Sequence, residues 1–113
     1  MAHLVTAVIK PHKLEAVKDA LRAAGVLGLS VSELQGYGRQ GGKSETFRGS
    51  EYTVDFVPKV KLEVVISSKD VETVIDLIAT SARTGKIGDG KIWSLPLGSV
   101  TRVRTGEKGD DAL

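Results

Sequence analysis

Two amphipathic helical stripes, each set between strand-like segments, constrain most strongly what this chain can fold into. The first follows Pro11, whose fixed φ angle suits the first turn of a helix, and it ends at Gly25. The second follows the helix-start residues 67–70 and ends before the turn-rich segment 84–90. Apolar residues recur at helical spacing in both stripes, at Leu14, Val17, Leu21 and Ala24 and at Val71, Val74, Ile75, Ile78 and Ala82.

The segments around these stripes have the alternation and the β-branched residues of strands. We expect strands over 3–10, 29–34, 60–66 and 91–97, and a short extra strand over 99–104. The order β-α-β-β-α-β, followed by that extra C-terminal strand, predicts an α+β fold of the ferredoxin-like kind. In this fold a four-stranded antiparallel sheet carries both helices on one face.

The face of the sheet opposite the helices is then left open. The third strand should start after Pro58 and alternate clearly, with Val60 to Ile66 apolar on one side and Lys61 and Glu63 on the other. An open apolar face predicts packing against another subunit or a ligand. We expect this open face to hold Val5, Ala7, Ile9 and Val65.

A long segment, residues 36–57, separates the second and third strands. A hairpin connection needs only about 2 to 5 residues, and much longer loops are usually functional or disordered. Its glycines, charges and aromatic rings follow neither a helix nor a strand period. We therefore expect it to stay mobile until a partner or ligand binds it. The alternative is a flexible insertion that has no function.

Composition narrows the class of protein. The 113 residues fit one domain, expected to span 1–113, and no cysteine is present for a disulfide or a thiolate metal site. The N-terminal apolar run is too short for a signal peptide, and no stretch approaches the roughly 20 apolar residues of a membrane span. We expect a soluble, cytoplasmic protein without membrane insertion. A formal charge of +2 gives no general argument for a nucleic-acid partner.

Residues 84–91 hold a glycine-rich turn that matches much of the P-loop pattern. Ile92 stands where that pattern needs Ser or Thr, and the turn follows a helix instead of a strand, so we reject a Walker-type NTPase. Converging backbone N–H groups still suit an anion, although a tight turn that merely needs glycine is an equal alternative. Arg102 and Arg104, on one face of an expected strand, add forked cations and favour a nucleotide polyphosphate.

At this point the chain resembles the PII nitrogen-regulatory signal-transduction proteins over essentially its whole length. The similarity lies in several motifs in the right order: VIKPHKLEAVKDAL, GYGRQ, FRGSEY, DFVPKVKLEVV, ARTGKIGDGKIW and RVRTGE. It implies a non-catalytic, ferredoxin-like homotrimer with ATP or ADP in the clefts between subunits. It also implies a T-loop at 36–57, which docks on nitrogen-metabolism enzymes and an ammonium channel, a B-loop at 84–91 and a C-terminal segment at 102–113.

The resemblance implies roles for individual residues as well. Gln40 would hold Mg²⁺ through its side-chain oxygen, and Lys59 would bind 2-oxoglutarate together with backbone amides near Gln40, Gly41 and Gly42. The implied nucleotide-binding residues are Gly28, Ser30, Gly36, Arg39, Gln40, Glu63, Gly88, Asp89, Gly90, Lys91, Arg102 and Arg104.

The T-loop carries the implied modification sites and the main departures. Tyr52 matches a tyrosine that a nucleotidylyltransferase uridylylates or adenylylates in different branches, and Ser50 a serine phosphorylated in another. Phe47 replaces a usual tyrosine, and residues 41–43 read Gly-Gly-Lys where Lys-Gly-His is more common. The lysine's electrostatic help is thereby lost, so an ATP/ADP sensor with little response to 2-oxoglutarate is the alternative.

Two other classes of function are weaker. An RNA-binding module of this fold would need paired exposed aromatics on its sheet, but the chain has only one Trp, two Tyr and two Phe. A small phosphate-hydrolysing enzyme would need an Arg and an Asn after the first strand, but the sequence contains no asparagine. We also find no nucleophile–base pair or carboxylate cluster in the sequence that would indicate an enzyme.

Overall fold

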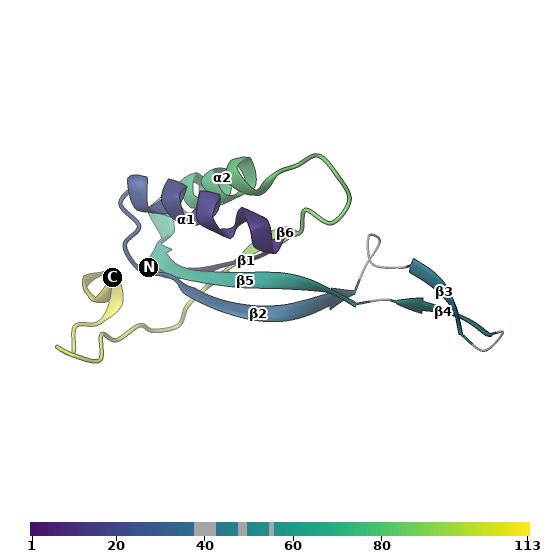
Figure 1. Ribbon diagram of the computed structural model, residues 1–113. Helices are drawn as coiled ribbons and strands as arrows, with labels where there is room; N and C mark the ends of the chain where they lie inside the picture. Colours follow the sequence, from purple (N-terminus) through teal and green to yellow (C-terminus); the bar gives the residue numbers. More distant parts are fainter. Residues whose placement is uncertain (38–42, 48–49, 55) are drawn as a thin grey trace.

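The computed structural model describes residues 1–37, 43–47, 50–54 and 56–113, and for the two short middle ranges only the course of the backbone. One antiparallel sheet has the strand order β2-β5-β1-β6, and both α-helices cover the same face of it (Figure 1). The main elements are β1 (Ala2–Ile9), α1 (Leu14–Ala23), β2 (Ser30–Tyr37), β5 (Phe56–Ser67), α2 (Val71–Ala82) and β6 (Lys91–Pro96). Short 3-10 turns cover Pro11–Lys13, Ser68–Asp70 and Gly109–Ala112. The predicted ferredoxin-like α+β fold is confirmed.

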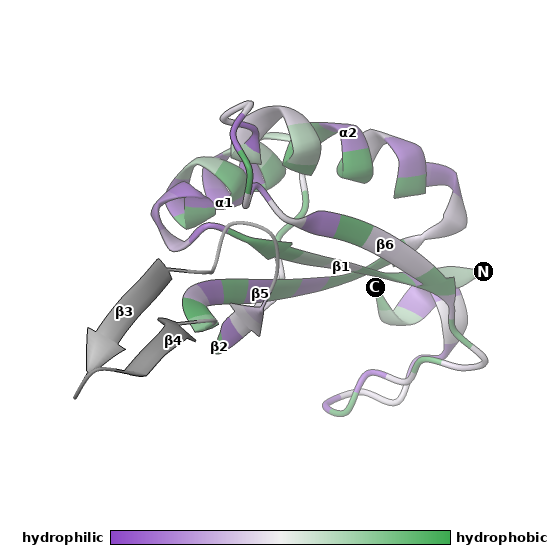
Figure 2. Ribbon diagram, turned by 90° about the vertical axis from the view of Figure 1, so that its right-hand side faces the viewer, coloured by the Kyte–Doolittle hydropathy of each residue, from purple (hydrophilic) through white to green (hydrophobic). Residues whose placement is uncertain are grey.

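The core lies between the helices and the sheet. Val17 and Leu21 of α1 and Ile78 of α2 are fully buried, as the helical spacing predicts. Figure 2 shows the hydrophobic side of both helices turned toward the strands. Each fully buried side chain of this size contributes about 1.5–3 kcal/mol relative to an exposed one, so the two stripes fix the helices on this face. None of the helices in the described ranges is long and apolar enough to cross a membrane.

The register of β1 corrects one prediction. Val5, Ala7 and Ile9 are buried under the helices and do not lie on the open face. Val5 is paired with Val64, and directly opposed residues share a face, so β1 sends these three side chains to the core. Val65, paired with Leu4, does lie on the open face, where 40% of it is exposed.

The segment 36–57 contains more strand than its composition suggested. Lys43–Phe47 (β3) and Ser50–Val54 (β4) pair in a separate two-stranded antiparallel sheet, so the prediction of no strand period there was wrong. Both carry β-favouring Thr and aromatic residues. β5 also starts earlier than predicted and includes Pro58. The proline is tolerated because β1 pairs β5 only from Val60 onward, so one side of β5 is unpaired at that point.

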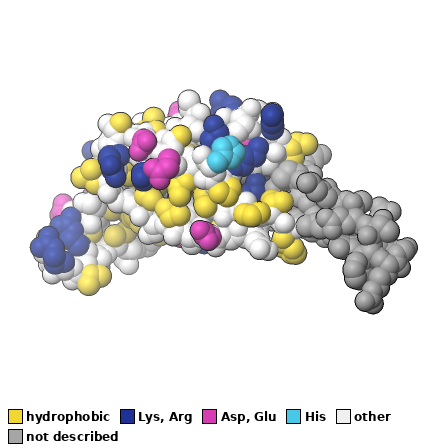
Figure 3. Space-filling model, in the orientation of Figure 1, with side chains coloured by type: hydrophobic (Ala, Val, Ile, Leu, Met, Phe, Trp, Pro, Cys, Tyr) yellow, Lys and Arg dark blue, Asp and Glu magenta, His cyan; other side chains and the backbone are white. Residues whose placement is uncertain are grey.

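The extra strand predicted over 99–104 is absent from the described structure. Only one isolated bridge, between Thr101 and Lys108, remains of it. The chain turns instead: the Gly106 N–H donates to the Arg102 carbonyl at 2.8 Å, with Gly106 at φ 85°. Arg102 and Arg104 therefore do not share a strand face, and the predicted pairing of their side chains was wrong. Figure 3 shows Lys and Arg side chains gathered over this C-terminal part of the chain.

Candidate functional site

The glycine-rich turn between α2 and β6 is organised by the carboxylate of Asp89. It accepts hydrogen bonds from the backbone N–H groups of Thr84 at 2.8 Å and Gly85 at 2.9 Å, and from the Thr84 hydroxyl. The Lys86 N–H in turn donates to the Thr84 hydroxyl oxygen at 3.1 Å. These bonds, those of Thr84 first, hold the pKa of Asp89 well below its usual range. Asp89 thus stays charged and closes the turn on itself.

Two lysines reach this turn from the sheet. The Lys10 ammonium, at the end of β1, lies 3.3 Å from a carboxylate oxygen of Asp89 and 3.2 Å from the Thr84 hydroxyl oxygen. Lys59 of β5, only 6% exposed, donates to the Gly88 carbonyl. Burial first, and then the neighbouring Lys10, lowers the pKa of Lys59, while Asp89 opposes this shift. The turn therefore sits over two closely spaced cations.

The backbone of the turn requires glycine at specific positions. Gly88 and Gly90 have φ angles of 99° and 100°, in the region that disfavours side chains. A Cβ on Gly90 would lie 1.8 Å from the Val8 carbonyl oxygen, so the turn crosses β1 closely. At the root of the long segment, a Cβ on Gly36 would come within 3.1 Å of the Lys59 side chain. Gly90 thus allows the turn to pass close to β1, and Gly36 leaves room for the Lys59 side chain.

The turn has the features of an anion cradle. Within the described part of the chain, the N–H groups of Ile87 and Gly88 donate no hydrogen bond to another group. Lys86 and Lys91 flank them and are exposed. Free amides next to exposed ammonium groups suit phosphate or carboxylate oxygens. The Asp89 carboxylate would by itself repel such a ligand, but its charge is offset by the hydrogen bonds within the turn and by Lys10.

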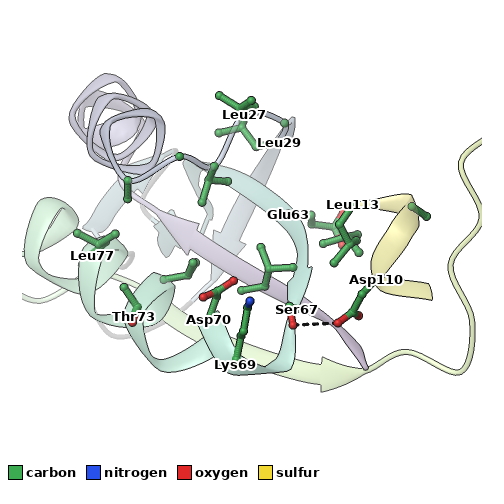
Figure 4. A pocket seen from close by; sticks show the side chains of 18 of the residues that line it. Leu27, Leu29, Glu63, Ser67, Lys69, Asp70, Thr73, Leu77, Asp110 and Leu113 are labelled. Atoms are coloured by element: carbon green, nitrogen blue, oxygen red, sulfur yellow. Dashed lines mark hydrogen bonds between the residues drawn. The ribbon is translucent and has the colours of Figure 1, made fainter. Parts of the chain in front are cut away.

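A second group of predicted residues lines a separate cavity of about 860 Å³. Gly28, Ser30 and Glu63 contribute to it from the α1–β2 connection, β2 and β5, and α2 closes another side. Figure 4 shows apolar side chains such as Leu27 and Leu77 and polar ones such as Glu63 around this space. A cavity with a mixed apolar and polar lining can hold a small molecule that is itself part apolar and part polar.

One chain does not bring the two groups together. In the β2–β5 register Ser30 opposes Glu63, whereas Leu34 opposes Lys59. Four residues of strand separate these pairs, about 13 Å at roughly 3.3 Å per residue. The Arg102 guanidinium is directed at the C-terminal residues instead. It donates to the Asp111 carbonyl at 3.3 Å and to the Leu113 carbonyl at 3.1 Å. Arg104 is exposed.

Several predicted positions lie outside the described residues. These are Arg39, Gln40, Gly41 and Gly42. Ser50 and Tyr52 belong to β4, but only their backbone is described. Among the described residues, no group of three or more His, Cys, Asp or Glu side chains could hold a metal ion.

Sequence reasoning missed two members of the site, Lys10 and Thr84. Thr84 was visible only as the first residue of the glycine-rich turn, and Lys10 only as the last polar residue before Pro11. They are 74 positions apart and meet only in the folded chain. No local motif marks such a pair.

The comparisons with known proteins decide the family. The family model described as "Nitrogen regulatory protein P-II" matches residues 2–107. The chain belongs to the P-II family. Relatives named nitrogen regulatory protein P-II occur in Cereibacter sphaeroides, 54% identical, and in Azospirillum brasilense, 53% identical; each alignment covers 96% of this chain and 97% of the relative.

The fold of the P-II family is also seen directly in a solved relative. The crystal structure of Arabidopsis thaliana PII bound to citrate superposes with a TM-score of 0.82 at 40% identity. The match covers 99% of this chain and 92% of that one. The resemblance inferred from the motifs is thereby confirmed, and with it a role in nitrogen regulation.

Gly90→Ala should destabilise the protein far more than Gly85→Ala. Both positions have positive φ, but only the Gly90 Cβ would collide with backbone, while nothing lies within 4 Å of a Cβ on Gly85. We expect about 1 kcal/mol for the Gly85 variant from conformational strain and at least about 3 kcal/mol for Gly90→Ala. Urea unfolding at one protein concentration measures both, and equal losses would contradict the close crossing over β1.

Asp89→Asn should reduce stability at neutral pH and have less effect in acid. The folded pKa lies below the unfolded one, so the carboxylate stabilises the fold above its ordinary pKa of about 3.9 and loses this as pH falls through the folded value. The difference in urea midpoint between wild type and variant should therefore shrink below about pH 4. Asp19→Asn on the exposed surface of α1 is the control, and a pH-independent difference for Asp89→Asn would contradict this.

Proposed function

We propose that this protein is a nucleotide- and metabolite-responsive regulator without catalytic turnover. ATP and ADP compete for one site, and 2-oxoglutarate binds only beside Mg-ATP. The observation that carries the proposal is the Asp89-centred turn, whose free amides and flanking lysines form an anion cradle in a chain of the P-II family. The proposal treats residues 1–113 as one domain, with the T-loop at 36–57, the B-loop at 84–91 and the C-terminal segment at 102–113.

The separation of the two residue groups supports a site between subunits. The B-loop of one chain would hold the phosphates, and the cavity of Gly28, Ser30 and Glu63 on the next chain would hold the base and ribose. Two different patches that meet form a heterologous contact, which closes into a ring when the rotation allows. A homotrimer is the ring that we propose.

The open face of the sheet supplies an apolar surface for such a ring. Val65, Trp93 and Leu95 are 40%, 43% and 53% exposed there, and Thr6 lies buried between their strands. Exposed apolar residues grouped on one sheet face are typical of subunit contacts. The trimer would bury this face and place the two half-sites opposite each other.

The residues fit a bound nucleotide in chemical terms. Gly88, Gly90 and Lys91 would contact phosphate oxygens, with Asp89 holding the turn. Arg102 and Arg104, on the chain that supplies the cavity of Gly28, Ser30 and Glu63, would add guanidinium donors. Gly36 leaves room for the Lys59 stem. Arg39 and Gln40 lie outside the described residues; as the family pattern has it, Gln40 would hold Mg²⁺, which neutralises phosphate charge.

A carboxylate effector fits beside the turn. Lys59 donates to the Gly88 carbonyl, a neutral acceptor that a carboxylate could replace with a stronger, charge-assisted bond. The related Arabidopsis protein was crystallised with citrate, which also carries carboxylates. We propose 2-oxoglutarate as the ligand here, held by Lys59 and the amides near Gln40, Gly41 and Gly42.

The output of the sensor is proposed to be the T-loop. Ligands at its root would favour one loop state over another, since only a difference in affinity for the two states is needed. Nitrogen-metabolism enzymes and an ammonium channel are the proposed targets, with Tyr52 the site for a nucleotidylyltransferase and Ser50 a weaker candidate for phosphorylation. The protein would be cytoplasmic and recruited to the membrane by that channel.

Calorimetric titration of 2-oxoglutarate should show binding with Mg-ATP but not with Mg-ADP or without nucleotide. Lys59→Met should weaken this binding roughly 10- to 100-fold, because a charge-assisted hydrogen bond contributes about 1.5–3 kcal/mol. Lys18→Met, on the surface of α1, is the matched control and should bind as wild type does.

The other outcomes are equally informative. ATP binding without any 2-oxoglutarate binding would favour the alternative ATP/ADP sensor and implicate the Gly41-Gly42-Lys43 departure. Binding of neither ligand would overturn the proposed function.

A further inference from the structure

The C-terminal segment of the chain folds back onto the cavity of Gly28, Ser30 and Glu63. Residues Asp110, Ala112 and Leu113 form part of its lining. Figure 4 shows the short C-terminal helical turn beside this space, with Asp110 and Leu113 close to its polar edge. The segment 109–113, here called the tail, therefore covers part of the half-site assigned above to the base and ribose.

The tail is held by a small set of polar contacts. The Ser67 hydroxyl donates to one Asp110 carboxylate oxygen at 3.2 Å, and the Met1 amino group lies 3.3 Å from the other. The Gly109 N–H donates to the Val100 carbonyl at 2.9 Å. Asp110 is the residue through which the tail meets the sheet, and the amino group first and Ser67 next lower its pKa.

The tail also binds Arg102, one of the cations proposed to contact the nucleotide. The Arg102 guanidinium donates to the Asp111 and Leu113 carbonyls, both in the tail. Both of these bonds come from Nη2, and Nη1 lies 3.6 Å from a carboxylate oxygen of Glu107, so both terminal nitrogens of the guanidinium fork are engaged and turned away from a phosphate. One segment thus covers part of the cavity and holds one of its cations.

We propose that the tail is a tethered competitor of the nucleotide: it covers the base half-site and holds Arg102, and ATP or ADP binding displaces it. This inference rests on the proposed function. Contacts between exposed polar groups are individually weak, so the closed tail is only slightly favoured and a ligand can release it. The apparent affinity for nucleotide equals the intrinsic affinity multiplied by the fraction of molecules in which the tail is open.

The test compares two single-charge variants of the full chain. Asp110→Asn weakens the tail's contacts to Ser67 and the amino group. Asp111→Asn removes the same charge one residue away, and only the Asp111 backbone carbonyl contacts Arg102. We expect Asp110→Asn to bind ATP about 2- to 10-fold more tightly than wild type, and Asp111→Asn to bind it equally. Calorimetry measures all three proteins.

A second readout follows the tail itself. The amide resonance of Gly109 in an NMR spectrum should move toward its random-coil position when ATP is added to the wild type, because displacement of the tail breaks the bond from the Gly109 N–H to the Val100 carbonyl. Equal ATP affinity in all three proteins with an unmoved Gly109 resonance would overturn the tail proposal and leave the nucleotide site standing. Weaker binding by Asp110→Asn would make the tail part of the site and also overturn competition. No ATP binding by any protein would overturn the proposed function and this inference together.

Discussion

The carboxylate of Asp89 is the group on which the candidate site depends. It accepts from the amides and hydroxyl at the start of the turn, and it pairs with Lys10 from the end of β1. The turn is thereby fixed to the sheet at the point where Gly90 crosses Val8 without room for a side chain. Lys59 reaches the same turn from β5, so the end of the core sheet and the B-loop form one unit. Any ligand of the B-loop acts on that unit.

Much of the fold could be predicted because the relevant signals are local. The helical stripes and the alternation of Val60 to Ile66 identified the helices and the third strand, and the element order led to the sheet topology. Which side of β1 faces the core could not be derived from the sequence, because the residues on both sides are apolar. Only the register with β5 decides between them. The prediction of a strand over 99–104 was wrong because a turn closed through Gly106 competes with extended pairing.

In the candidate site too, local motifs could be predicted, whereas contacts between distant positions could not. The glycines of the B-loop were visible as a motif, since positive φ and close backbone approach require that residue type. The role of Asp89 as an organiser of the turn, and the presence of Lys10 beside it, depend on contacts between distant positions and left no pattern in the sequence. The separation of the B-loop from the cavity of Ser30 and Glu63 likewise appears only in the β2–β5 register. That separation is the observation from which we infer a site shared between two chains.

The central claim is that each nucleotide site takes one half from each of two chains. The most direct measurement mixes Lys91→Met, altered in the B-loop half, with Arg104→Met, altered in the proposed opposite half, and counts ATP sites by calorimetry after subunit exchange. Each variant alone should bind ATP weakly, whereas random mixed rings should regain tight binding at about one quarter of the sites, where two intact halves meet. Tight binding that does not return on mixing, although exchange has occurred, would contradict a shared site.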